Sequence, residues 1–167
     1  MTFFEFGAMD ATGSLRLREA LASDIPALAN VFRTAALEAG PQYYTPHQVR
    51  EWAAFADEDE AFSHFILKAT TLIAEEDAGI VGFGGIENDG HIASLYVRPD
   101  RLRRGIGSAL LARLVELAAE RGIKRLYAET NLLSRPLFER FGFEWIDTET
   151  VERGEALFER YIVERVM

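Results

Sequence analysis

The chain has 167 residues, 49% of them hydrophobic, which is the size and composition of one globular domain. A formal net charge of -9 argues against a nucleic-acid-binding protein, because contact with phosphates requires a basic surface, and it favours a cationic small molecule or a basic peptide as the partner. The sequence has no cysteine, which excludes disulfides and a cysteine nucleophile, and its FFEF segment is too short and too acidic for a signal peptide or membrane span, so we expect a cytoplasmic protein.

Apolar patterns divide the chain into strands and helices, with no internal repeat and no low-complexity linker. Residues 1–13 predict a loose leader and residues 14–167 a single domain, and we interpret Asp57–Glu60 as a solvated break. In chain order we expect a strand at Leu15–Arg18, a helix from about Ser23 to Ala39, a helix from Thr45 to Phe55, strands at Thr71–Glu75, Ile80–Ile86 and His91–Val97, a helix from Ile106 to Gly122, a strand at Arg125–Thr130, a short helix at Ser134–Phe141, and a hairpin of Phe143–Glu152 with Ala156–Val166.

Two turn signals and one long helix set the expected order of the central strands. Asp77-Ala78-Gly79 and Asn88-Asp89-Gly90 are short turns, so three antiparallel strands follow one another as a meander. The helix from Ile106 separates the strands at His91–Val97 and Arg125–Thr130, and a crossover of this kind makes two strands parallel neighbours. The pattern therefore predicts an α/β (α+β) fold with a mixed sheet.

The most specific segment is Leu95–Leu111, which reads LYVRPDRLRRGIGSALL. An apolar strand runs into a loop of Pro and Arg residues, and Gly105-Ile106-Gly107 opens an amphipathic helix. The first N–H groups of a helix have no partner inside it and can hold a phosphate. Arg101, Arg103 and Arg104 add guanidinium groups just before the glycines. The segment therefore predicts a ligand that carries a pyrophosphate.

Two motifs in the second half of the chain resemble those of the GNAT superfamily of acyl-CoA-dependent N-acetyltransferases. Leu95–Pro99 followed by Arg104–Leu111 resembles the acyl-CoA motif, and Asn131–Phe143, NLLSRPLFERFGF, resembles the second motif. The order of the elements supports the resemblance from Leu15 to Val166. Further features are similar to one subgroup of small bacterial acetyltransferases with mostly undefined acceptors: Tyr43-Tyr44-Thr45-Pro46, Trp52, Gly90-His91-Ile92 and Arg153-Gly154.

The resemblance implies a GNAT fold, with a mixed and mostly antiparallel central sheet, flanked by helices, whose parallel strands 4 and 5 splay apart. Here these strands are His91–Val97 and Arg125–Thr130. The resemblance also implies acetyl-CoA (coenzyme A) as the cofactor, with its pantetheine arm in the gap between the strands, where unpaired main-chain groups can bind it. The implied cofactor-binding residues are Leu95, Tyr96, Val97, Arg103, Arg104, Gly105, Ile106, Gly107, Ser108, Asn131 and Ser134.

The implied reaction is direct acetyl transfer from the thioester to a primary amine of a small molecule or peptide in a ternary complex. A primary ammonium has a pKa near 10.4, so roughly one molecule in a thousand is nucleophilic at neutral pH, and a general base should help. We consider Glu87, His91 and Glu129 as bases, and a backbone N–H near Leu95 as the group that binds the oxyanion. We expect neither nucleic acid nor a membrane as a partner, and the sequence leaves a homodimer open.

Three positions depart from the family's pattern. Leu102 replaces the usual Gln or Arg, and Arg103 replaces a frequent glycine, but backbone amides make most of that contact. Phe138 occupies the position of a tyrosine that protonates the leaving thiolate in many members, and phenylalanine cannot donate a proton. Tyr161 or Ser134 could serve instead, or solvent could, because a thiol has a pKa of only about 8.5.

Several of these residues also have purely structural interpretations. His91 follows a turn and could be a surface or strand-end residue, and Glu129 could pair with a neighbouring arginine. Tyr43, Tyr44 and Trp52 could wall the acceptor site, or they could form an ordinary packing cluster. The histidines have no recognisable metal-ligand spacing, so the sequence predicts no metal site.

Two other function classes stand as alternatives. The same fold could bind acyl-CoA without catalysis, as a sensor or scaffold, because Phe138 cannot donate a proton and no base is clearly marked. A nucleotide-binding regulatory module is the third class, since Gly105-Ile106-Gly107 with Glu129 about twenty residues on imitates a dinucleotide fingerprint. Leu110 stands in place of its third glycine, however, and the sequence contains no Walker loop.

Overall fold

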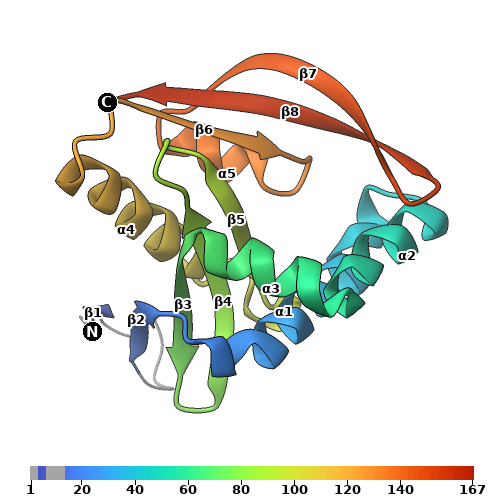
Figure 1. Ribbon diagram of the computed structural model, residues 1–167, viewed down its shortest axis with the longest axis horizontal. Coiled ribbons are helices and arrows are strands. Elements are labelled where there is room, and N and C mark those ends of the chain that lie inside the picture. The colour runs from blue at the N-terminus through green and yellow to red at the C-terminus, as the bar shows by residue number, and fades with distance from the viewer. Residues whose placement is uncertain (1–3, 7–13) are drawn as a thin grey trace.

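The computed structural model describes residues 4–6 and 14–167, which form two antiparallel sheets with helices packed around them (Figure 1). The first sheet has the strand order β1-β2-β3-β4-β5 and the second the order β6-β8-β7. In chain order the elements are β1 (Phe4–Phe6), β2 (Leu15–Glu19), α1 (Ile25–Ala39), α2 (Pro46–Ala54), α3 (Asp59–Lys68), β3 (Thr70–Glu76), β4 (Gly79–Ile86), β5 (Ile92–Val97), α4 (Ile106–Glu120), β6 (Arg125–Thr130), α5 (Arg135–Arg140), β7 (Glu144–Arg153) and β8 (Ala156–Val166).

Helices cover both faces of the five-stranded sheet. Ile73 of β3 packs with Leu28 and Phe32 of α1 on one face. Its neighbours Leu72 and Ala74 pack on the other face, with the apolar side of α4, because successive residues of a strand point to opposite faces. The predicted meander of β3, β4 and β5 and the predicted helix α4 are therefore confirmed, and both faces of the sheet are buried.

Helix α3 contradicts the interpretation of Asp57–Glu60 as a solvated break. Asp59 and Glu60 form the first turn of this helix, where carboxylates interact favourably with the helix dipole. Phe62 and Ile66 lie one turn apart and are each only 1% exposed, in the same core cluster as α1. The acidic residues are the solvent-facing first turn of an amphipathic helix. Its buried residues, Phe62 and Ile66, are too few to give a clear helical pattern in the sequence.

The predicted leader, residues 1–13, lies largely outside the described residues. Within it, the backbone of β1 pairs antiparallel with β2, in the register Phe4 to Leu17, whereas residues 1–3 and 7–13 are not described. None of the helices in the described part of the chain has the length and apolar character needed to cross a membrane.

Strands β5 and β6 start side by side and then separate. The Tyr127 N–H donates to the carbonyl oxygen of Gly90 at 3.1 Å, and one parallel bridge joins His91 to Tyr127. A side chain at Gly90 would collide with the Arg125 carbonyl, so glycine allows this close approach. Further along, β5 pairs with β4 and β6 pairs with β8. The predicted splayed pair is confirmed, and it divides the expected mixed sheet into two.

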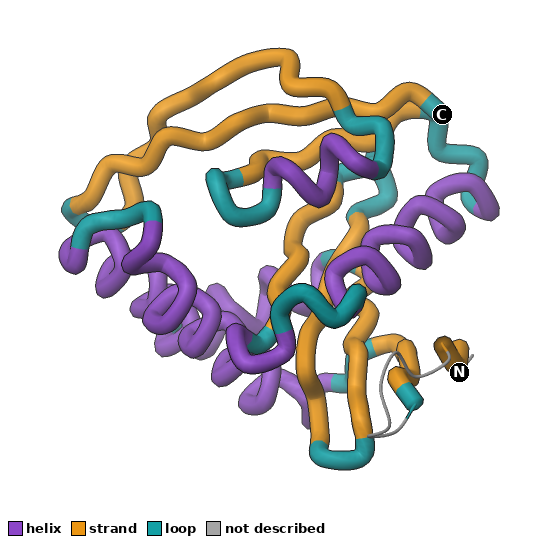
Figure 2. Tube along the Cα trace, turned by 180° about the vertical axis from the view of Figure 1, so that it is seen from behind, coloured by secondary structure: helices purple, strands orange, loops and turns teal. Residues whose placement is uncertain are grey.

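The long strands β7 and β8 arch over β6 and α5, and their hairpin turn reaches α2 (Figures 1 and 2). Gln48 of α2 donates a hydrogen bond from Nε2 to the Leu157 carbonyl at 2.7 Å. Thr45 caps α2 as predicted, because its Oγ1 accepts the Gln48 N–H at 3.2 Å. The hairpin is thereby fixed to the helices that cover the other sheet.

Candidate active site

The gap between β5 and β6 opens into a first cavity of about 510 Å³. Its walls come from β5, from the loop and first turn of α4, and from the loop between β6 and α5. The predicted cofactor-binding residues that line it are Leu95, Tyr96, Val97, Arg103, Gly105, Ile106, Gly107, Ser108, Asn131 and Ser134. Arg104, also predicted, is not among the lining residues and is exposed.

The edge of β5 turns main-chain polar groups toward this cavity. The Arg98 N–H donates to the Val81 carbonyl of the neighbouring strand at 2.8 Å. Because the hydrogen-bonding direction alternates along an antiparallel strand, Leu95 and Val97 direct their N–H and C=O groups away from β4, into the gap. This edge can therefore accept a ligand amide as it would accept another strand.

A turn rich in unpaired amides closes the cavity at the start of α4. Gly105, the N-cap, has a φ of 80°, a conformation that glycine adopts at no steric cost. The first helical hydrogen bond joins the Ala109 N–H to the Gly105 carbonyl, so the N–H groups of Ile106, Gly107 and Ser108 precede the helical ladder. These amides and the positive end of the helix dipole are groups that can bind an anion. We call residues 103–108 the phosphate turn.

The arginines of this loop divide into two kinds. Arg101 is held by Glu76 at 3.2 Å and by Asp100 at 3.1 Å, so its charge is already neutralised. Arg103 is exposed and lines the cavity, with a φ of 63° that only a few per cent of residues other than glycine adopt. Glycine adopts this conformation at no steric cost, which is consistent with the frequent glycine at this position in the motif that the sequence resembles.

Asn131 and Ser134 form a compact turn on the opposite wall. The Asn131 Oδ1 accepts the N–H groups of Leu133 and Ser134, both at 2.9 Å, and lies 3.2 Å from the Ser134 Oγ. These hydrogen bonds order the loop between β6 and α5. Asn131, Leu133 and Ser134 of this loop line the first cavity.

A second cavity, of about 300 Å³, lies on the other side of the same gap. Aromatic residues form much of its wall. The three candidate bases predicted from the sequence, Glu87, His91 and Glu129, also line it. The residues that line both cavities, and so mark where the two meet, are Trp52, Ala93, Tyr96, Glu129 and Asn131. The two cavities are therefore neighbours, and both border Glu129.

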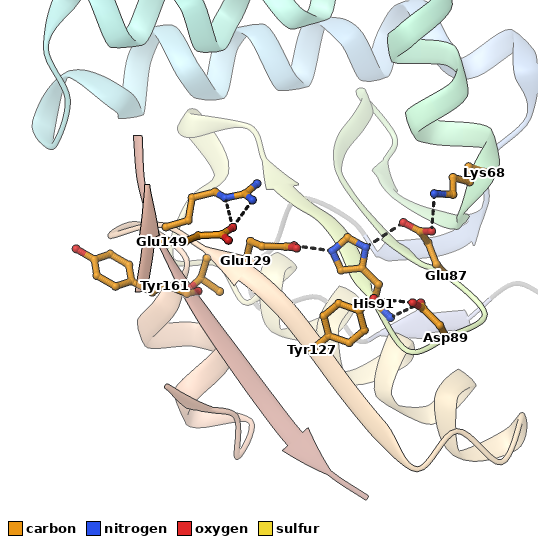
Figure 3. Close-up of polar contacts among 10 residues, drawn as sticks. Lys68, Glu87, Asp89, His91, Tyr127, Glu129, Glu149 and Tyr161 are labelled. Carbon is orange, nitrogen blue, oxygen red and sulfur yellow. Dashed lines mark hydrogen bonds and ion pairs between the residues drawn. The ribbon is translucent and has the colours of Figure 1, made fainter. Parts of the chain in front are cut away.

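The structure brings the three candidate bases into one row (Figure 3). His91 Nε2 lies 2.5 Å from the Glu129 Oε2, and His91 Nδ1 lies 3.0 Å from the Glu87 Oε1. Lys68 Nζ continues the row at 3.1 Å from the other oxygen of Glu87, and its side chain is 58% exposed. The row therefore links the junction of the cavities to solvent through hydrogen bonds.

The same contacts set the protonation of the row. Burial disfavours the charged imidazole, but the hydrogen bonds to Glu129 and Glu87 outweigh it and raise the pKa of His91 above 6.5. The hydrogen bond from His91 lowers the pKa of Glu129 against the effect of burial. Burial opposes the charge of Glu87 as well, yet its bonds to His91 and Lys68 lower its pKa. The carboxylates are thus held ionised beside a histidine that protonates readily.

Tyr127 and Asp89 support His91, and the sequence analysis missed both. The Tyr127 ring stacks on the imidazole with 4.9 Å between centroids, and its hydroxyl donates to Asp89 at 2.5 Å. Asp89 also accepts the main-chain N–H of His91 at 3.1 Å. The register of the predicted parallel pair would have indicated that Tyr127 lies beside His91. Glu129 lies two residues after Tyr127, so its side chain is on the same face of β6.

Other predicted site residues lie in different places. Tyr43 lines the first cavity, Tyr44 lines the second, and Trp52 lines both. Tyr161 lines neither cavity, and its ring packs against Trp145 at 5.6 Å, pointing away from the His91 row (Figure 3). Phe138 is 3% exposed, lines the first cavity and packs edge-on against a neighbouring phenylalanine.

Comparison with known proteins agrees with this arrangement. Residues 41–159 match the model of the acetyltransferase (GNAT) domain. The chain is 29% identical over 149 residues to the uncharacterized N-acetyltransferase YafP of Escherichia coli, which covers 89% of this chain and 93% of that protein.

Solved structures share the whole fold. A GCN5-related N-acetyltransferase from Rhodopseudomonas palustris superimposes with a TM-score of 0.88 at 26% identity, covering 96% of this chain and 100% of the other. The PaiA N-acetyltransferase of Thermoplasma acidophilum, solved in complex with coenzyme A, has a TM-score of 0.77 at 19% identity, covering 92% and 99%. The mixed α/β architecture with its splayed strands is thus the GNAT fold, and the chain belongs to the GNAT acetyltransferase domain family.

Proposed function

We propose that this protein is an acetyl-CoA-dependent N-acetyltransferase that acts on a primary amine of a small molecule or peptide. The observation that carries the proposal is the meeting of two cavities at Glu129. One cavity offers a strand edge and a phosphate turn, and the other offers aromatic walls and a row of titratable groups. This is the arrangement that a transfer between two bound molecules requires.

The residues that line the first cavity support acetyl-CoA as its ligand. The amides of Ile106, Gly107 and Ser108 would hold the pyrophosphate with Arg103, and the main chain of Leu95 and Val97 would bind the pantetheine amides. Acetyl-CoA supplies an activated acyl group, whose carbon–sulfur bond breaks as the amine nitrogen bonds to the carbonyl carbon, the electron pair leaving on sulfur.

In the proposed mechanism Glu129 removes the proton from the acceptor ammonium. Glu129 lines both cavities and is held ionised by His91 at 2.5 Å, so it is the carboxylate that an amine at the junction meets. His91 positions the Glu129 carboxylate, and Glu87 holds the other imidazole nitrogen. The Glu129 side chain is 27% exposed, so it can release the proton to solvent after the transfer.

Two further groups complete the proposed chemistry. The Leu95 N–H, directed into the gap, can donate to the carbonyl oxygen as negative charge builds there. Phe138 offers no proton to the departing thiolate, and Tyr161 lies outside both cavities. We therefore assign thiolate protonation to solvent, which is feasible because a thiol has a pKa of about 8.5.

Thioester turnover with a panel of primary amines tests the proposed function. We expect acetyl-CoA to be consumed only when an amine is present, with one acetylated amine formed for each free thiol. Binding of CoA without turnover of any amine would instead show an acyl-CoA sensor. Tighter binding of NAD than of CoA would show a nucleotide-binding module and contradict the cofactor assignment.

A further inference from the structure

The second cavity has a cation on its wall that no carboxylate neutralises. Arg153, the last residue of β7, lines this cavity and lies over the Phe55 ring with 6.0 Å between its guanidinium carbon and the centroid. Across the described ranges, 4–6 and 14–167, Arg153 forms no ion pair. Its charge is therefore available to a ligand.

Four other charged groups that line this cavity are in ion pairs. Arg160 is paired with Glu149 on the neighbouring strand. Glu87 and Glu129 share His91, and Glu87 also holds Lys68. Glu159 also lines the cavity, and its side chain is exposed and belongs to no ion pair within residues 14–167. Arg153 is thus the cationic group on this wall that has no ion pair among the described residues.

The hairpin that carries Arg153 is fixed in place. Gly154, with a φ of 59°, lies against the Glu51 carboxylate of α2 so closely that a side chain at this position would collide with it. Three residues further on, the Leu157 carbonyl accepts the hydrogen bond from Gln48 of α2. Both contacts hold the main chain of the turn against α2, so the residue that carries the guanidinium lies beside the cavity before a ligand binds.

Aromatic rings form a large part of the cavity wall beside Arg153 and the row of Glu87, His91 and Glu129. They are those of Phe32, Tyr44, Trp52, Phe55, Phe65, Tyr96 and Phe158. The cavity volume of about 300 Å³ is at the low end of the range for small-molecule sites, so it suits a compact acceptor and not a folded protein segment. A ligand that satisfies all three surfaces has a cationic end, an apolar body and an anionic end.

We propose that the acceptor is an amine that also bears a carboxylate, on an apolar or aromatic body. Its carboxylate pairs with Arg153, its body packs against the aromatic walls, and its amine faces Glu129. This assignment rests on the proposed function, because it names the substrate class of the same site. A guanidinium donates two parallel hydrogen bonds to a carboxylate, which orients the amine as well as binding it.

Acetyl transfer to matched pairs of acceptors tests the assignment. The pairs are 6-aminohexanoate with hexylamine, and phenylalanine with phenethylamine, each measured with acetyl-CoA and the full chain. The first pair is the more informative, since a remote carboxylate hardly alters the basicity of the amine. We expect the carboxylate-bearing member of at least one pair to have a kcat/KM about tenfold higher, which is the effect of a hydrogen-bonded charge pair.

The variant R153Q should reduce that ratio to about one, because the preference then has no cation to act through. The control is R50Q, which removes the same charge from an exposed residue of α2 that lines neither cavity, and it should leave the ratio unchanged. A ratio that survives in R153Q, or equal use of both members in both pairs, would overturn the assignment. Preference for 1,6-diaminohexane over all four would also overturn it, in favour of a dicationic acceptor.

The assay separates this inference from the function on which it rests. Acetylation of hexylamine or phenethylamine without any carboxylate preference would support the enzyme and overturn the substrate class. If no amine is acetylated, the proposed function fails, and calorimetry of the CoA-bound protein with phenylalanine and phenethylamine still measures the carboxylate preference and its dependence on Arg153. Equal affinity for the two in that experiment would overturn the inference as well.

Discussion

The two cavities that border Glu129 differ in the groups that form them: main-chain groups dominate the first cavity and side chains the second. The first is formed largely by main-chain groups, at the edge of β5 and at the start of α4, with few side-chain requirements beyond glycine. The second is formed by side chains from α1, α2, β5, β6 and the β7–β8 hairpin. Substitutions hardly alter main-chain groups, so the first cavity can keep its ligand while the sequence changes. The second cavity can change its ligand, because substitutions replace the side chains that form it.

Substitution of the carboxylate at the junction should have the largest effect on this comparison. Glu129→Gln removes the proton acceptor, and we expect kcat to fall by about 10²- to 10³-fold, the usual contribution of a general base. CoA affinity should change little, because the phosphate turn is untouched. The measurement is steady-state kinetics together with calorimetric titration of CoA.

The matched control for that substitution is Glu116→Gln, at a carboxylate on α4 whose side chain is 64% exposed. It lines neither cavity and should retain full activity. Equal kinetics of the Glu129 and Glu116 variants would show that the row beside His91 has no part in catalysis.

A substitution at the phosphate turn should break the first cavity and leave the second intact. Gly105→Leu places a side chain at a φ of 80°, at a strain cost of about 1–2 kcal/mol, and projects it beside the phosphate amides. We expect CoA affinity to fall at least about tenfold, the effect of losing one charge-assisted hydrogen bond. Calorimetry with CoA measures the change.

Gly122→Leu is the matched control, because Gly122 ends the same helix with a φ of 69° and open space around it. The two variants should lose similar stability, and only Gly105→Leu should lose CoA binding. Comparable loss of affinity in both would mean that helix strain, and not the phosphate turn, governs binding.

The charge state of the His91 row predicts a pH-dependent stability. Because the folded pKa of His91 is raised, its contribution is present below about pH 6.5 and is lost as the pH rises through the folded value. The pKa values of Glu87 and Glu129 are lowered, so their contribution is present above about pH 4.5 and is lost as the pH falls through their folded values. The row therefore stabilises the fold most between these limits.

Replacement of the imidazole measures that contribution. The free energy of unfolding of the wild type should exceed that of His91→Gln by about 1–3 kcal/mol near pH 5.5, which is the usual value for hydrogen bonds to charged groups. The difference should become smaller as the pH rises toward 9. Chemical denaturation at a series of pH values provides the test. A difference that is constant from pH 5 to pH 9 would contradict the proposed charge state.

The smallest effect is expected at the position of the missing tyrosine. Phe138→Tyr adds a hydroxyl to a ring that borders the first cavity, and we expect the free energy of unfolding to change by less than about 1.5 kcal/mol, with kcat unchanged or higher. Thermal denaturation and the rate of thiol release are the two measurements. Loss of folding would show that this ring belongs to sealed core.

The first cavity was predictable from the sequence because its information is local. The glycines and arginines of the loop before α4 are contiguous, and the crossover helix fixes the parallel neighbours that splay. Ten predicted cofactor residues consequently line one cavity. The exception, Arg104, shows the limit of this reasoning, since a run of three nearby arginines does not tell which of them faces inward.

The second cavity was less predictable because it depends on tertiary contacts. His91 and Glu129 are far apart in the sequence, and their register became visible only with the single bridge between β5 and β6. Arg153 and Phe158 reach the cavity through the arch of the β7–β8 hairpin, which no local pattern specifies. Helix α3 was not predicted for a similar reason. Its two buried residues, Phe62 and Ile66, are buried through tertiary contacts with α1, which no local pattern shows.

The central claim is that β5 and β6 separate to hold a cofactor whose reactive end reaches Glu129. A crystal structure of the full chain with CoA tests it most directly. We predict pantetheine amides on the main chain of Leu95 and Val97, the pyrophosphate on the amides that begin α4, and the thiol at the junction beside Glu129. CoA bound elsewhere, or a continuous hydrogen-bonded ladder between β5 and β6 in that crystal, would contradict it.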